Sequence, residues 1–285
     1  DLLAADPRRA LGRKSYNNEE GVGVLCKFLD SAVRLPIQCH PDRAFARKHY
    51  NSEHGKAESW IVLDTREIDG EQPYLLLGFK PDVNPSAFKK AALNQDVSVM
   101  VNSLHRIPVS PGDIYFIPGR VPHAIGPGVF LLEVQEPTDW VVQPERFIGG
   151  TKLSDLEMWG PLTPAIGLEC FDYGGADSQE NITERLRLEP KTTRQNEEGQ
   201  IETIIGQETT PCFRVDRLTV RKSMEFSYNV PWHIAIVTEG RGEVACDEGV
   251  DTIRPGDYFF VSNEIEALHY KATDGPLIVY LVSKD

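Results

Sequence analysis

The sequence predicts an all-β protein in which two strand-rich blocks are joined by a mixed helical bridge. Short β-rich runs separated by Gly and Pro occupy residues 22–145 and return after residue 205. The segments "VSPGDIYFIPGR" (109–120) and "IRPGDYFFVSNE" (253–264) share Pro-Gly-Asp followed by a strand with two aromatic residues, which indicates a duplicated unit. Strands grouped in two blocks favour β-sandwiches or barrels over a parallel α/β sheet.

The first block, residues 1–145, contains five expected strands and one helical interval. The strands are "PIQCH", "SWIVLD", "PYLLLGF", "GDIYFIP" and "GVFLLEVQ". The interval "PSAFKKAALNQDVSVMVNSLH" places Phe88, Ala91 and Ala92 at helical spacing, so we expect helix there.

The remaining chain is expected to form a bridge over 146–205 and a second strand block over 206–285. In the bridge, "SDLEMWG" and "SQENITERLRL" are predicted helical and "PKTTRQNEEGQ" is a predicted solvated connection. The expected strands of the second block are "CFRVDRLTV", "WHIAIVTEG", "RGEVACD", "GDYFFVS" and "LIVYLVS". The sequence therefore predicts three parts.

Composition excludes several classes of partner. A formal net charge of -13 argues against nucleic acid, because phosphate backbones require a basic face. No run of about 18 apolar residues is present, so we expect no membrane span. The first residues lack a signal-peptide pattern, and the five cysteines are odd in number and scattered, which favours reduced thiols and a cytoplasmic location. The oligomeric state cannot be predicted from these features.

Polar groups on expected strands of the first block indicate a metal site. Gln38 and His40 alternate along one strand and so share a face, while Glu58 and His123 lie on other strands. Burying such groups is costly unless they find a partner, and a metal ion satisfies all of them at once. The oxygen and nitrogen donors suit zinc, with iron, manganese, cobalt or nickel as alternatives. The second block offers only His233 and His269, so we predict it to be metal-free.

Four segments carry a resemblance to a known family: "PIQCHPD" (36–42), "GKAESW" (55–60), "PGDIYFIPGRVPHAIGPG" (111–128) and "LLEVQEPTD" (131–139). In this order and spacing they resemble type I mannose 6-phosphate isomerase, a family of cupin proteins. The resemblance implies two cupin-type β-barrels, or jelly rolls, with helical insertions. It places Gln38, His40, Glu58 and His123 on the metal ligands, Lys56 on an active-site lysine, and Glu133 on an acidic residue proposed for proton handling.

The implied reaction accounts for these residue types. Interconverting an aldose and a ketose moves a proton between adjacent carbons through an enediol, which requires a base and electrophiles. Lys56 lies two residues before Glu58 and should share its face, so it can relay a proton or hold an anionic substrate. The expected function is interconversion of mannose 6-phosphate and fructose 6-phosphate, with a sugar or sugar phosphate as the small-molecule partner.

Three departures from the family pattern keep other functions open. Pro36 stands where the family usually has a serine, and Gln143 stands where it has an arginine, although Arg146 lies three residues further on. The family also usually opens with a stretch that includes Trp-Gly-Gly, which this sequence lacks. The alternatives are an isomerase of a non-phosphorylated sugar and a catalytically inactive regulatory cupin that binds metal or sugar.

Overall fold

The computed structural model describes residues 2–12, 21–227 and 230–284, and its contacts divide the chain into two units. One unit is formed by residues 25–188, and the other by the residues up to 24 together with those from 189 onward. The expected bridge over 146–205 is therefore shared between the units. Contacts do not test whether a unit folds alone, so the domain boundaries 1–145, 146–205 and 206–285 stay a prediction.

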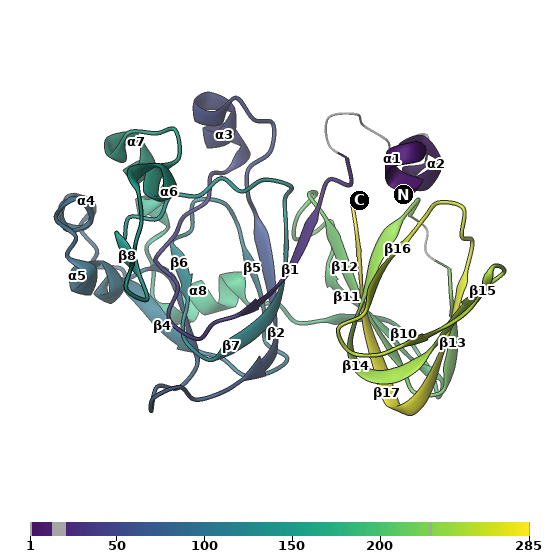
Figure 1. Ribbon diagram of the computed structural model, residues 1–285. Coiled ribbons are helices and arrows are strands. Elements are labelled where there is room, and N and C mark those ends of the chain that lie inside the picture. The colour runs from purple at the N-terminus through teal and green to yellow at the C-terminus, as the bar shows by residue number, and fades with distance from the viewer. Residues whose placement is uncertain (1, 13–20, 228–229, 285) are drawn as a thin grey trace. The chain divides into compact units, whose positions relative to one another are not determined.

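The first unit is built on two antiparallel sheets, one of four strands and one of three (Figure 1). One has the order β1-β7-β2-β5, with bounds Leu25–Asp30, Val129–Gln135, Glu58–Thr65 and Ile114–Ile117. The other has the order β4-β3-β6, with bounds Leu104–Pro108, Tyr74–Phe79 and His123–Ile125. Apolar side chains from both sheets, including Trp60, Leu75, Tyr115, Ile125 and Leu131, form one buried core. The alternating inward positions of the strands thus pack the two sheets face to face.

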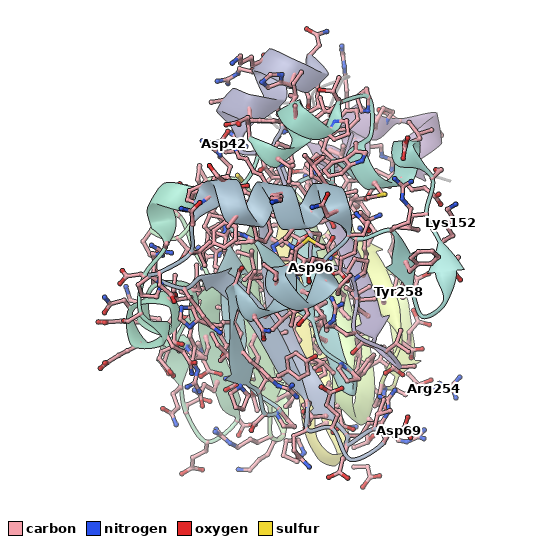
Figure 2. All side chains as sticks on the ribbon, turned by 90° about the vertical axis from the view of Figure 1, so that its left-hand side faces the viewer. Asp42, Asp69, Asp96, Lys152, Arg254 and Tyr258 are labelled. Atoms are coloured by element: carbon pink, nitrogen blue, oxygen red, sulfur yellow. The ribbon has the colours of Figure 1, made fainter. Side chains whose placement is uncertain are left out.

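The helices of the first unit interrupt and follow its strands. They are α3 (Arg43–Tyr50), α4 (Pro85–Asn94), α5 (Val97–Asn102), α6 (Asp155–Trp159), α7 (Pro164–Leu168) and α8 (Gln179–Leu186), with a 3₁₀ turn at Tyr173–Gly175. A two-stranded hairpin, β8 (Phe147–Ile148) with β9 (Thr151–Lys152), precedes α6. Figure 1 shows α3, α6 and α7 at the same end of the unit. Asp42 and Asp96, labelled in Figure 2, cap α3 and α5 by accepting from backbone N–H groups.

The second unit is built on one antiparallel sheet of order β10-β11-β12-β17-β14-β15, with β13 paired to β17 and β16 to β14. The bounds are β10 Lys191–Gln195, β11 Gly199–Ile205, β12 Arg214–Val220, β13 Ser223–Phe226, β14 His233–Cys246, β15 Gly249–Ile253, β16 Tyr258–Val261 and β17 Leu268–Ser283. Two short helices, α1 (Leu2–Ala5) and α2 (Pro7–Leu11), also belong to this unit. Two expected strands, "WHIAIVTEG" and "RGEVACD", are parts of the single long strand β14.

The predicted all-β class is confirmed, with two corrections. The strands of the described residues form open antiparallel sheets rather than a closed barrel. The segment "PKTTRQNEEGQ", expected to be a solvated connection, contains strand β10, and every residue of β10 is exposed. The prediction was wrong because the polar composition of this segment indicates only that its side chains are exposed to solvent. Its backbone hydrogen bonds come from pairing with β11 at the sheet edge.

The two Pro-Gly-Asp turns have the same geometry, as a duplicated unit predicts. Gly112 and Gly256 have φ of 93° and 92°, a region that favours glycine. Asp113 and Asp257 each accept a hydrogen bond of 2.9 Å from the backbone N–H three residues earlier. Both glycines donate to a valine carbonyl on the neighbouring strand, Val62 and Val237 respectively. The two turns therefore share both their sequence and their backbone geometry.

Among the described helices, none has both the length and the apolar character that crossing a membrane requires.

Candidate metal centre

Three buried side chains converge between the sheets of the first unit. His40 follows a pair of isolated bridges, Glu58 is the first residue of β2, and His123 is the first residue of β6. Their ligand atoms all lie within 4.8 Å of one another. His40 Nε2 is 3.1 Å from Glu58 Oε1, and His123 Nε2 is 3.7 Å from Glu58 Oε2. Each residue is at most 1% exposed, so the group forms a closed polar cluster inside an apolar core.

Both histidine rings are oriented by backbone carbonyls. Nδ1 of His40 lies 2.9 Å from the carbonyl oxygen of Trp140, and Nδ1 of His123 lies 2.9 Å from that of Val121. Because a carbonyl only accepts, each Nδ1 carries the proton and each Nε2 presents a lone pair. Nε2 of His123 finds no hydrogen-bond partner among the described residues. This orientation is the one that metal-binding histidines adopt.

The protonation states of the three residues also suit a cation. Burial lowers the pKa of His123 to about 3 and lowers that of His40, so both rings are neutral at pH 7. Burial alone would raise the pKa of Glu58, but His40 and Lys56 outweigh it and lower that pKa well below its usual range. Two neutral imidazoles and one carboxylate at this spacing form a donor set that a divalent metal ion takes without further deprotonation.

Lys56 and Gln38 lie beside the three converging residues. Lys56 is 7% exposed, and its Nζ lies 2.9 Å from Glu58 Oε1 and 3.3 Å from His40 Nε2. Gln38 and His123 exchange backbone hydrogen bonds of 2.8 and 2.9 Å. Directly opposed residues of an antiparallel pair project to the same side. The half-buried Gln38 is thus next to the cluster, and its amide as a fourth ligand stays a prediction.

Glu133 lies on β7, in the same four-stranded sheet as Glu58. In that sheet β2 lies between β7 and the edge strand β5. In the register of β7 it is opposite Trp60 of β2 and Lys27 of β1. Its Oε2 accepts a hydrogen bond of 3.0 Å from Trp60 Nε1, and its Oε1 is 3.6 Å from Lys27 Nζ. Burial, reinforced by the charge of Glu58, raises the pKa of Glu133 to about 7. A carboxylate with this pKa both accepts and releases a proton near neutral pH.

Comparisons with known proteins agree with this geometry. No family model matches the chain. It is 24% identical over 249 residues to mannose-6-phosphate isomerase ManA of Bacillus subtilis, covering 84% of this chain and 68% of that protein. A mannose-6-phosphate isomerase of Streptococcus mutans is 25% identical over 285 residues, covering 97% of this chain and 78% of that protein.

The chain is a relative of the mannose-6-phosphate isomerases.

Solved structures of these isomerases share the fold. The crystal structure of the mannose 6-phosphate isomerase from Bacillus subtilis matches with a TM-score of 0.77 at 20% identity, covering 99% of this chain and 80% of that one. A zinc-bound mannose 6-phosphate isomerase matches with a TM-score of 0.72 at 14% identity, covering 100% of this chain and 84% of that one. The resemblance drawn from four short segments is therefore confirmed over the whole chain, together with the all-β, cupin-type fold.

Lys27 is a neighbour of Glu133 that the sequence prediction missed. Its Nζ donates to Gln135 Oε1 at 2.7 Å and to Asp139 Oδ1 at 3.2 Å, besides facing Glu133. A signal for it exists in "LCKFLD", where a lysine occupies an alternating position between apolar residues of a strand. Sequence alone gives no partner for that lysine, because the register of β1 against β7 decides which carboxylate it meets.

Arg146 does not join the metal cluster. Its Nη1 lies 2.5 Å from Asp155 Oδ1 and donates to the carbonyl of Leu153 at 3.3 Å. Its backbone N–H donates to Gln95 Oε1. Its backbone carbonyl accepts from the N–H of Leu153 at 2.8 Å. A role for Arg146 at the sugar stays a prediction. The nearby Gln143, at the family's arginine position, donates from its side chain to the carbonyl of Glu157 at 2.9 Å.

Gly55 and Gly119 pack closely against the turn that follows His40. We therefore predict that a larger residue at Gly119 lowers both the stability of the protein and its affinity for the metal. A Cβ on Gly119 would lie 2.6 Å from the backbone nitrogen of Asp42, and one on Gly55 would lie 2.6 Å from the carbonyl oxygen of Pro41. We expect Gly119→Ala to displace this turn, reduce the free energy of unfolding by roughly 1–3 kcal/mol, and weaken metal binding. Thermal melts and metal titration check it.

Gly174→Ala is the matched control, because the nearest atom to its added Cβ is a side-chain oxygen at 3.3 Å. An unchanged metal affinity in Gly119→Ala would show that the turn does not position His40.

Proposed function

We propose that the chain is a metal-dependent aldose-ketose isomerase that interconverts mannose 6-phosphate and fructose 6-phosphate. The observation that carries the proposal is the joint placement of a buried donor set (His40, Glu58 and His123), a buried ammonium (Lys56) and a carboxylate with a pKa of about 7 (Glu133). The names of its relatives support the same reaction.

Zinc is the proposed metal, held by His40, Glu58 and His123 with Gln38 as the fourth ligand. The nitrogen and oxygen donors and the zinc-bound neighbour support this choice, and iron, manganese, cobalt or nickel are the alternatives. When bound, the metal supplies an electrophile for the sugar oxygens.

The chain's own residues carry the proton transfer. Glu133 in its ionised form takes the proton from C2 of the aldose and returns it to C1. Lys56 donates a proton to the C1 oxygen and takes one from the C2 hydroxyl, so the carboxylate and the ammonium are both regenerated in each turnover. Lys56, a cation buried beside the cluster, stabilises the negative charge that develops on the enediol oxygens. The sheet thereby separates the two tasks, with the base on β7 and the ammonium just before β2.

A coupled assay for fructose 6-phosphate formation tests the proposal. The metal-loaded protein is offered mannose 6-phosphate, free mannose and lyxose. Turnover of the phosphorylated sugar with the highest kcat/KM is the expected result. A preference for a free sugar would establish the non-phosphorylated alternative, which is motivated by Pro36 and Gln143 at the positions of the family's serine and arginine. No turnover of any sugar would refute the enzyme proposal and leave a regulatory binding protein.

Arg146 is the proposed substitute for the missing arginine, and its substitution tests the phosphate contact. If Arg146 leaves Asp155 to bind phosphate, Arg146→Ala should raise KM for mannose 6-phosphate about tenfold and leave KM for a free sugar unchanged. Asp155→Ala is the control, because it frees the guanidinium and should not raise either KM. Equal effects of Arg146→Ala on both sugars would contradict the assignment.

A cytoplasmic setting is proposed from the thiols. Cys39 and Cys170 are buried thiols whose sulfur atoms lie 3.9 Å apart without a bond. A reducing compartment keeps such a pair as thiols.

A further inference from the structure

Trp60 lies between the metal cluster and the proposed base. It is fully buried and lies two residues after Glu58 on β2, so both side chains project to the same face of the sheet. Its ring is nearly perpendicular to that of His123, at 78° with centroids 5.2 Å apart. Its Nε1 donates to Glu133 Oε2 at 3.0 Å. One rigid side chain therefore contacts a proposed metal ligand with its ring and the proposed base with its polar atom.

The indole hydrogen bond divides the two oxygens of Glu133 between different neighbours. Indole has a single donor and no acceptor, so its contact with Oε2 is fixed in direction. Oε1 faces Lys27, at a longer distance of 3.6 Å, and that lysine also has Gln135 and Asp139 as partners. We propose that Trp60 is a positioning residue, whose indole N–H holds Oε2 of Glu133 so that Oε1 is the oxygen that exchanges the proton with the sugar. The inference rests on the proposed isomerase function.

The charged groups around Glu133 show what this bond contributes. Lys27 of β1 and Lys56, just before β2, favour the ionised carboxylate, and Glu58 of β2 opposes it. Trp60 is the neutral donor in this set, and its hydrogen bond also favours the ionised form. Its loss should therefore leave Glu133 both less well oriented and harder to ionise, with no change in the charges around it.

The test is a double-mutant cycle in the zinc-loaded, full-length protein. We expect Trp60→Phe to lower kcat about tenfold with KM for mannose 6-phosphate within about twofold of wild type. In a Glu133→Gln background the same substitution should change the residual kcat by less than about twofold, because the group that it positions is no longer a base. The acid limb of the wild-type pH profile should move up by about one pH unit in Trp60→Phe.

Trp159→Phe is the matched control, since Trp159 is also buried in the first unit but packs in the core cluster around α6. It should keep kcat and the pH profile while losing similar stability. An equal loss of kcat in both Glu133 backgrounds, or a loss explained by lower zinc content, would overturn the inference. If wild type shows no isomerase activity, the proposed function fails instead.

A second measurement does not depend on isomerase activity. The sequence has four tryptophans, so four indole N–H resonances are expected, and comparison with Trp60→Phe assigns one of them. Glu133→Gln should shift the Trp60 indole proton more than the other three, because its acceptor loses its charge. Four unshifted resonances would show that Trp60 does not hold this carboxylate.

Discussion

Glu58→Gln is expected to lower zinc affinity more than about 100-fold and to abolish nearly all isomerase activity. Glu58 is the charged member of the donor set, and its two oxygens face the two histidines, Oε1 toward His40 and Oε2 toward His123. An amide of the same shape keeps the packing but removes the negative charge that a divalent cation requires. Elemental analysis after dialysis and the coupled assay measure both effects.

Glu58→Gln should also destabilise the protein through Lys56. The substitution leaves that buried ammonium without its partner at 2.9 Å, which should cost about 3 kcal/mol of unfolding free energy in the metal-free protein. Glu145→Gln is the matched control, because Glu145 is an equally buried carboxylate that pairs with Arg34. It should lose stability without losing zinc. Full zinc retention in Glu58→Gln would refute the ligand assignment.

Glu133→Gln is expected to lower kcat by about 10³-fold, with zinc content unchanged. The reason is its role as the proposed base: a neutral amide cannot accept the proton. In wild type the pKa of about 7 sets the sign of the pH dependence, since the base must be ionised. We therefore expect kcat to rise with pH up to and through about 7, and the Glu133→Gln variant to lose this rise. Stopped assays across pH 5–9 measure it.

Lys27→Met also tests whether Glu133 is the base. Lys27 lowers the pKa of Glu133, so its removal should raise that pKa and move the acid limb of kcat to higher pH.

A Glu133→Gln variant that keeps a tenth or more of wild-type kcat would show that another group is the base.

Local sequence patterns predicted the candidate metal ligands more completely than the rest of the site. Alternation along one extended segment relates Gln38 to His40, and the same period relates Lys56 to Glu58, because side chains two residues apart in a strand share a face. These relations are local, so they can be read without knowing which strands pair. The apolar residues around them identify the segments as parts of a core.

Only the tertiary structure decided which groups meet across strands. The contacts of Glu133 with Trp60 and Lys27 join residues 73 and 106 positions apart, and both depend on the register of β7 between β2 and β1. A shift of one residue would turn Glu133 to the opposite face. Likewise, folding decides that Arg146 pairs with Asp155 and that β10 pairs with β11. The sequence by itself predicted an all-β protein with a candidate metal site at His40, Glu58 and His123, while folding determined the surroundings that raise the pKa of Glu133.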